Sequence, residues 1–233
     1  MYDGKRILAI IPARGGSKGI KKKNLRMVQG KKLIEYTLDA ATNSKYIDHI
    51  FVSTDDLEIA EVASSNGIEV PELRPKKLAT DEAKTIDSLL HTIEYLKVNK
   101  GEEFDYVILL QPTQPLRTSQ HIDESVELII DNKWESLVGV SPVNDHPSLI
   151  RSIQNDSVIE PLLKQTSTIR RQDFIAYYKV NGAIYVNKIN EAFNSETSLN
   201  DNKHAYIMND YEDVDIDEIR DLELLNFVLT NKK

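Results

Sequence analysis

The stretch ILAIIPARGGSKGIKKKNL, from Ile7 to Leu25, decides which fold this sequence predicts. It begins with an apolar, isoleucine-rich run up to Pro12, which is typical of a strand covered on both faces. The run changes abruptly into glycine, serine and lysine residues, as a loop after a strand does. Ligands of open α/β sheets bind beyond the carboxyl ends of the strands. The loop from Arg14 to Asn24 is therefore predicted to form part of a binding site.

The composition of this loop suits an anion. Gly15 and Gly16 would let the backbone approach a ligand and adopt positive φ, and successive N–H groups in such a turn form an anion-binding nest. Arg14, Lys18 and Lys23 could neutralise a polyphosphate. The alternative is a solvated basic loop that binds no ligand, and residue chemistry alone leaves both interpretations open.

The two best-known glycine motifs for phosphate are absent from the loop. A P-loop would need its second glycine where Ile20 stands, and the dinucleotide fingerprint would need a glycine where Ser17 stands. The loop therefore disfavours an NAD-dependent oxidoreductase.

Further along the chain, strand-like apolar runs alternate with segments of helical periodicity. This alternation, with short connections, predicts an α/β fold with a mostly parallel, Rossmann-like sheet flanked by helices. We expect strands over residues 49–54, 68–70, 106–110 and 136–143, and helices over 33–42, 57–67, 85–98 and 119–132, the last with Ser119 as its N-cap.

After these elements the alternation ends. Residues 144–180 are polar and irregular, which predicts a β-rich excursion inserted into the domain. Order then returns, with strands expected over 182–186 and 204–208 and an amphipathic helix over 217–231. We therefore expect a single domain over residues 1–233 that carries the excursion at about 144–180.

Bulk composition narrows the classes of function. The chain has 233 residues and a formal net charge of −8, whereas a general nucleic-acid binder would be basic. The lysine cluster is thus a local feature of an acidic protein and suits a small anionic ligand. The absence of cysteine excludes a disulfide framework and fits a cytoplasmic protein. No segment reaches the roughly 18 apolar residues of a membrane span.

The motif DVDID places three carboxylates at alternate positions. In an extended segment, Val214 and Ile216 would point to one side, and Asp213, Asp215 and Asp217 to the other. Such an oxygen-rich group suits Mg²⁺. The alternative is that Asp217 caps the last helix and the other carboxylates are solvated.

The segment LLQPTQPLRT follows the predicted strand at 106–110. Its two prolines stiffen the loop, and Gln111, Thr113 and Arg117 offer directional hydrogen bonds. The segment is predicted to be either a specificity loop or a structural turn.

Other polar positions carry weaker signals. Asn181 and Gly182 precede a predicted strand as a ligand contact or a simple turn, and Tyr185 either reaches a ligand or packs in the core. His146 alone is weak evidence for catalysis, and residues 170–173 (RRQD) bind an anion or are solvated.

Taken in chain order, these motifs resemble those of the acylneuraminate cytidylyltransferases, also called CMP-sialic acid or CMP-nonulosonate synthetases. The resemblance runs through most of the chain and is carried by six blocks: IIPARGGSKGIKKKNL, VSTD, RPKKLATD, LLQPTQPLRT, RRQDFIAYYKVNGAIY and DVDID. CMP-Kdo synthetases have a similar opening block, but the LLQPT–PLR and NGAIY blocks resemble the sialic acid branch.

The resemblance implies a fold of the nucleotide-diphospho-sugar transferase type with a small dimerisation excursion. It implies an Mg²⁺-dependent reaction in which CTP and a nine-carbon α-keto sugar acid give a CMP-sugar and pyrophosphate. Whether the acid is N-acetylneuraminic, legionaminic or pseudaminic acid stays open. The alternatives are a CMP-Kdo synthetase, another sugar nucleotidyltransferase, or, more remotely, a non-catalytic nucleotide-binding domain.

The resemblance also implies roles for individual residues. The family usually has arginine where Lys179 stands, and lysine keeps the charge but loses the planar fit to a carboxylate. The implied catalytic residues are Arg14, Lys18 and Asp215; nucleotide-binding residues are Arg14, Gly15, Ser17, Lys18, Lys23, Asn24, Arg74 and Thr80; sugar-binding residues are Gln111, Arg171, Lys179, Asn181 and Tyr185; metal ligands are Asp215 and Asp217.

The composition of the excursion supports the implied homodimer. An irregular segment with this many apolar side chains needs a surface on which to bury them, and a two-fold pair is the commonest arrangement. The apolar residues are Ile150, Ile153, Leu162, Leu163, Phe174, Tyr177 and Tyr178.

Overall fold

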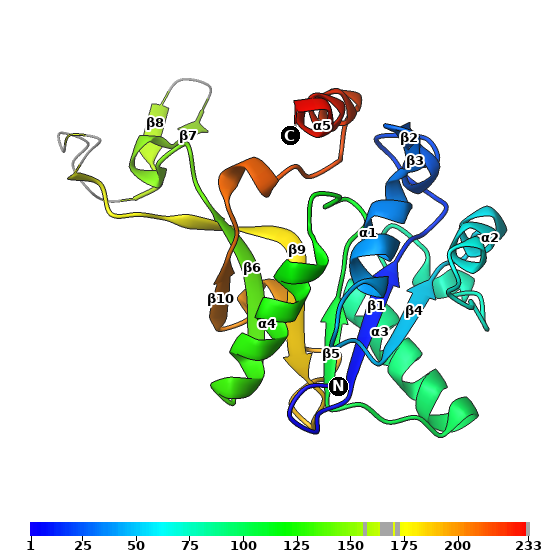
Figure 1. The fold of residues 1–233 in the computed structure, drawn as a ribbon. Helices are drawn as coiled ribbons and strands as arrows, with labels where there is room; N and C mark the ends of the chain where they lie inside the picture. The colour runs from blue at the N-terminus through cyan, green and yellow to red at the C-terminus, as the bar shows by residue number, and fades with distance from the viewer. Residues whose placement is uncertain (156–157, 164–169, 171–172, 232–233) are drawn as a thin grey trace.

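The computed structural model describes residues 1–155, 158–163, 170 and 173–231 (Figure 1). Its centre is a six-stranded sheet in the order β10–β6–β9–β5–β1–β4. The strands are β1 (Ile7–Pro12), β4 (His49–Ser53), β5 (Tyr106–Leu109), β6 (Ser136–Pro142), β9 (Tyr178–Lys188) and β10 (His204–Ile207). Only β9 runs against its neighbours, β5 and β6. The prediction of a mostly parallel α/β sheet is therefore confirmed.

Helices cover both faces of this sheet (Figure 1). The helices are α1 (Leu33–Thr42), α2 (Leu57–Ser65), α3 (Thr85–Tyr95), α4 (Ser119–Asp131) and α5 (Ile219–Asn231). The hydrophobic cluster on one face contains residues of α1, α2 and α4, and the cluster on the other contains residues of α3. None of the helices in the described part of the chain is both long and apolar enough to span a bilayer.

Strand β1 shows why its sequence is apolar without interruption. Ile7 and Ile11 lie in the cluster that contains α1, α2 and α4, whereas Leu8 and Ile10 lie in the cluster that contains α3. All four side chains are fully buried. Each contributes about 1.5–3 kcal/mol to folding by leaving water, so this strand anchors the loop that follows it.

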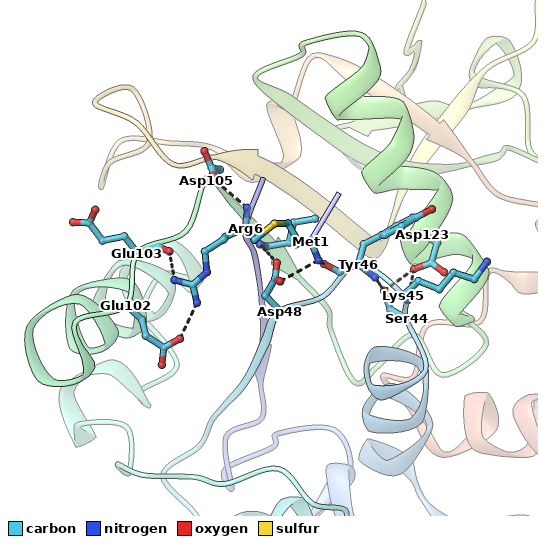
Figure 2. Close-up of polar contacts among 11 residues, drawn as sticks. Met1, Arg6, Ser44, Lys45, Tyr46, Asp48, Glu102, Glu103, Asp105 and Asp123 are labelled. Atoms are coloured by element: carbon cyan, nitrogen blue, oxygen red, sulfur yellow. Dashed lines mark hydrogen bonds and ion pairs between the residues drawn. The ribbon is translucent and has the colours of Figure 1, made fainter. Parts of the chain in front are cut away.

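The amino end of β1 is fixed by polar contacts at the edge of the sheet opposite that loop (Figure 2). Asp48 accepts a hydrogen bond from the Ile7 N–H at 2.8 Å and pairs with the terminal amine of Met1 at 3.0 Å. Asp105 accepts a hydrogen bond from the Arg6 N–H at 2.9 Å. Polar contacts at the amino ends of the strands thus hold neighbouring segments together, and the opposite, carboxyl ends of the strands are available for a site.

Several element boundaries differ from the predictions. No strand forms over 68–70, because Ile68 packs into the core beside the end of α2 instead of joining the sheet. The helix predicted over 85–98 ends at Tyr95 and continues as a wider turn, η3 (Leu96–Lys100). The N-cap of α4 is Thr118 rather than Ser119, since the Thr118 hydroxyl accepts the N–H of His121 at 3.3 Å.

The start of the last helix also differs. Helix α5 begins at Ile219, which makes Glu218 its N-cap position, and the carboxylate of Asp221 in the first turn accepts the N–H groups of Asp217 and Glu218. The interpretation of Asp217 as the helix cap is therefore wrong, and its carboxylate is left for other contacts.

The excursion contains an antiparallel hairpin, β7 (Arg151–Gln154) and β8 (Val158–Pro161). Figure 1 shows the hairpin standing away from the sheet. In chain order the hairpin lies between β6 and β9, and β9 begins at Tyr178 and extends beyond the strand predicted over 182–186.

Candidate active site

A cavity of about 470 Å³ opens at the carboxyl ends of β1 and β5. It is lined by the loop after β1, by residues between 74 and 88, by the loop after β5 and by the DVDID motif. The predicted site residues that line it are Arg14, Ser17, Lys18, Lys23, Asn24, Arg74, Thr80, Gln111, Asp215 and Asp217. Residues from opposite ends of the chain thus meet in one place, as the resemblance implied.

The basic loop and the aspartate motif are packed directly against each other. Lys23 donates a hydrogen bond to the backbone carbonyl of Ile216 at 2.6 Å and pairs with the Asp217 carboxylate at 3.0 Å. A Cβ atom added to Gly19 would overlap the carbonyl oxygen of Asp217. Glycine is therefore required at this position for the two segments to approach so closely.

The apolar residues of DVDID hold the motif in place. Val214 and Ile216 are buried in a small cluster with Ile20 of the basic loop, as the alternation predicts. The Ile216 N–H donates to the carbonyl of Thr113 at 2.9 Å. The aspartate motif is thereby attached both to the basic loop and to the loop after β5.

Two of the three carboxylates face the cavity. Asp215 and Asp217 line it, whereas Asp213 pairs with Lys179 at 2.8 Å and its side chain is only 5% exposed. The expectation that all three point together is therefore wrong for Asp213. Lys179, at the start of β9, pairs with the Asp213 carboxylate, which therefore does not line the cavity.

The electrostatics of Asp215 suit a cation. Burial raises the pKa of the Asp215 carboxyl, and the negative charge of Asp217 adds to the effect. A divalent cation would relieve this repulsion, and oxygen donors are the ligands that Mg²⁺ prefers. Within the described ranges, no group of three or more His, Asp or Glu side chains is arranged to hold a metal. Two carboxylates would not complete the coordination of Mg²⁺, so phosphate oxygens of a ligand would have to supply further donors.

Two of the loop's cations share one partner that the sequence did not identify. The Asp81 carboxylate pairs with Arg14 at 2.7 Å and with Lys18 at 3.1 Å. Hydrogen bonds from Lys18 and Arg14 hold the pKa of Asp81 below its usual value. Asp81 is the last residue of the RPKKLATD block. Its place in that motif is the one feature of the sequence that could have indicated a role in the site.

Gly15 and Asn24 shape the loop. The Gly15 N–H donates to the Asp55 carboxylate at 2.9 Å, and an added Cβ would press against Asp56. The Asn24 amide donates to the carbonyl of Arg14 at 3.2 Å. The positive φ expected at Gly15 and Gly16 is not observed, because close packing rather than a left-handed turn requires glycine at position 15.

Arg74 connects its segment to the end of β4. It is 8% exposed, and its guanidinium donates to the hydroxyl and carbonyl oxygens of Ser53 at 2.9 and 2.5 Å. Burial lowers its pKa to about 10, so it stays charged at neutral pH. Thr80 lies further along the same segment, on the cavity wall.

A second cavity of about 500 Å³ adjoins the first, and both are lined by Thr85 and Gln111. Tyr185 also lines it, and the Tyr185 hydroxyl donates to Asn200 at 3.0 Å. The segment from Ser195 to Asn200 contributes further hydroxyl and amide groups. Two of the predicted sugar-binding residues, Gln111 and Tyr185, are therefore brought together here.

The other predicted sugar-binding residues lie elsewhere. Asn181 is buried, donates to the Ser141 hydroxyl at 3.0 Å and accepts the Ala183 N–H at 3.0 Å. Lys179 is paired with Asp213, and neither residue lines the two cavities. Arg171 lies outside the described residues. Binding of the sugar by these three residues stays a prediction.

Arg117 is an internal support of the site rather than a surface contact. It is 3% exposed, and its guanidinium donates to the Ala183 carbonyl at 2.8 Å, the Gln111 carbonyl at 3.2 Å and the Thr37 hydroxyl at 2.6 Å. Burial lowers its pKa to about 9. It fixes the loop after β5 to β9, so that Gln111 is positioned between the two cavities.

Comparison with known proteins places this chain in a family. The family model described as "Cytidylyltransferase" matches residues 8–233. The CMP-N,N'-diacetyllegionaminic acid synthase of Legionella pneumophila is 38% identical over 215 residues, which are 91% of each chain. The N-acylneuraminate cytidylyltransferase of Escherichia coli O18:K1:H7 is 33% identical over 94% of this chain, which spans only 51% of that protein.

The fold comparison agrees. The solved structure of CMP:2-keto-3-deoxy-manno-octonic acid synthetase complexed with CTP superposes with a TM-score of 0.72 at 17% identity, covering 98% of this chain and 100% of that one. At that identity the likeness shows the fold alone. With a family match over nearly the whole sequence and relatives above 30% identity, the chain belongs to the cytidylyltransferase family.

Proposed function

We propose that the protein transfers the cytidylyl group of CTP to a nonulosonic acid, a nine-carbon α-keto sugar acid, giving a CMP-sugar and pyrophosphate. The observation that carries this proposal is the meeting of Arg14, Lys18 and Lys23 with Asp215 and Asp217 in one cavity. The adjoining cavity, lined by hydroxyl and amide groups, suits a polyhydroxylated acid. The names of relatives at 33–38% identity support this substrate class.

In this reaction a hydroxyl oxygen of the sugar acid forms a bond to the α-phosphorus of CTP, and the bond to the pyrophosphate leaving group breaks. Such displacements depend mainly on positioning and on neutralisation of charge. Arg14 and Lys18 would stabilise the negative charge that develops on pyrophosphate. Gln111, at the boundary of the two cavities, would orient the acid toward the nucleotide.

We assign Asp215 and Asp217 as the residues that would hold Mg²⁺. When bound, the ion supplies positive charge to phosphate oxygens. Lys23 is paired with Asp217 in this structure and would keep part of the local charge balanced before the nucleotide enters. We also propose a cytoplasmic enzyme, which the absence of cysteine fits.

The alternative of a CMP-Kdo synthetase is less well supported. The similarity to the solved enzyme of that specificity is 17% identity, which reflects a shared fold. A non-catalytic nucleotide-binding domain is disfavoured by the carboxylate pair in the phosphate cavity, because binding alone needs no such pair.

The test is pyrophosphate release with CTP and each of four acids: N-acetylneuraminic, legionaminic, pseudaminic and Kdo. Release is expected with at least one of the three nonulosonic acids, only with CTP among the nucleotides, and only with a divalent cation present. Pyrophosphate release with Kdo but with none of the three nonulosonic acids would favour the CMP-Kdo synthetase. If none of the four acids leads to pyrophosphate release, the proposal is refuted.

We further propose that the protein is a homodimer that pairs through the β7–β8 hairpin. Ile153 and Ile159 lie opposite each other on this hairpin and are 72% and 63% exposed. Two copies that cover these side chains would remove apolar surface from water.

Sedimentation equilibrium at micromolar concentration should therefore give twice the chain mass of 26.5 kDa. The double substitution Ile153→Asp and Ile159→Asp should shift the protein toward monomer. Leu57→Asp, at a residue that is 67% exposed on α2, should not. A monomeric wild-type protein would contradict the proposal.

A further inference from the structure

The carboxylate of Asp81 forms ion pairs with both Arg14 and Lys18, the two cations that would stabilise pyrophosphate in the proposed reaction. Asp81 uses one oxygen for Arg14 and the other for Lys18, at 2.7 and 3.1 Å. All three residues line the first cavity. The Asp81 carboxylate therefore lies where an oxygen of a bound polyphosphate would meet the same two groups, and the two anions cannot both hold these cations fully.

The exposure of these side chains indicates that the contact can exchange. Side-chain exposure is 45% for Asp81, 76% for Lys18 and 33% for Arg14. Ion pairs this accessible to water are weak, so a polyphosphate, which carries more charge than one carboxylate, can displace Asp81. Without a partner, the long and exposed Lys18 side chain would sample many rotamers.

The backbone around Asp81 allows such a movement. Asp81 lies between the short helix η2 (Lys76–Leu78) and the start of α3. The backbone hydrogen bonds on either side of it are turn contacts, among them Leu78 N–H to the Pro75 carbonyl at 2.8 Å, Ala79 N–H to the Lys76 carbonyl at 3.1 Å and Ala83 N–H to the Thr80 carbonyl at 3.4 Å. The anchor of the segment is the buried Arg74, which stays attached to β4.

We propose that Asp81 is a positioning residue that acts as an internal competitor of pyrophosphate: it holds Arg14 and Lys18 in place in the free enzyme and takes them back as pyrophosphate leaves. This inference rests on the proposed function, because pyrophosphate is the product of that reaction. A ligand that must first displace an internal partner binds with an affinity reduced by the population of the competent state. Asp81 thus weakens product binding and favours release.

The test is pyrophosphate binding to the protein, measured by isothermal titration calorimetry without sugar acid or divalent cation. Asp81→Asn keeps the size of the side chain and removes its charge, and it should bind pyrophosphate about fivefold more tightly than the wild type. Glu82→Gln removes the same charge one residue away and should bind as the wild type does. Thermal melting of both variants checks that they are folded.

A kinetic measurement separates this role from a structural one. In Asp81→Asn, inhibition by added pyrophosphate should strengthen by about the same factor as binding, while the KM for the sugar acid stays unchanged. Unchanged or weaker pyrophosphate binding by Asp81→Asn would overturn the inference, as would equal tightening in Glu82→Gln. If the protein releases no pyrophosphate with any sugar acid, the proposed function fails, but the binding comparison still decides whether Asp81 competes with polyphosphate.

Discussion

Replacing Asp215 by alanine is expected to lower kcat by about 1000-fold and to leave the fold intact. Asp215 faces the cavity, and its carboxyl is held beside Asp217. Loss of a group that organises charge in the transition state costs several kcal/mol, and each 1.36 kcal/mol is about tenfold in rate. Initial rates of pyrophosphate release at saturating CTP, sugar acid and Mg²⁺ measure the effect, with circular dichroism to verify the fold.

The control for this prediction is Glu218→Ala. Glu218 follows Asp217 in the chain, pairs with Arg220 at 3.1 Å and does not line the cavity. It should therefore keep wild-type kcat. Near-normal turnover by Asp215→Ala in the presence of Mg²⁺ would exclude Asp215 from the reaction.

Replacing Gly19 by alanine is expected to lower kcat/KM for CTP by about 100-fold with little change in melting temperature. The new methyl group would overlap the carbonyl oxygen of Asp217, so the basic loop and the aspartate motif must separate. A displacement of about 1 Å in a catalytic group can cost about 100-fold in rate. Steady-state kinetics with CTP varied at saturating sugar acid measure this loss.

Gly16 offers a matched control in the same loop. A Cβ atom added to Gly16 meets nothing within 4 Å, and the φ of Gly16 is not in the left-handed region. Gly16→Ala should therefore keep kcat/KM within about twofold of the wild type. If the two variants behave alike, the close approach of Gly19 to Asp217 does not matter for catalysis.

Periodicity predicted the sheet well because its strands are short and buried. The residues of β1 alternate between two covered faces, and a continuous apolar run of this length is typical of a buried strand in a parallel sheet. The strand expected at 68–70 was wrong for a related reason: Ile68 is buried, and burial without pairing produces the same apolar signal. The direction of β9 could not be read from its sequence at all.

The sequence motifs predicted which segments form the site, but they did not predict which side chains contact each other there. The alternation in DVDID correctly buries Val214 and Ile216, yet nothing local indicated that Lys179 would draw Asp213 away. The ion pairs of Asp81 with Arg14 and Lys18 join residues more than 60 positions apart. Arg117 was predicted to offer hydrogen bonds in a polar loop, and only the packing of β9 shows that its partners are inside the protein.

The place of β9 in the sheet has a consequence for how the chain is made. Strands β5 and β6 are synthesised well before β9, but they are not neighbours, and β9 must enter between them. Until the ribosome has produced residues 178–188, the nascent chain carries two unpaired strand edges in what becomes the middle of the sheet. Unpaired edges are templates for aggregation, so the insertion of β9 between β5 and β6 covers two such edges in one step.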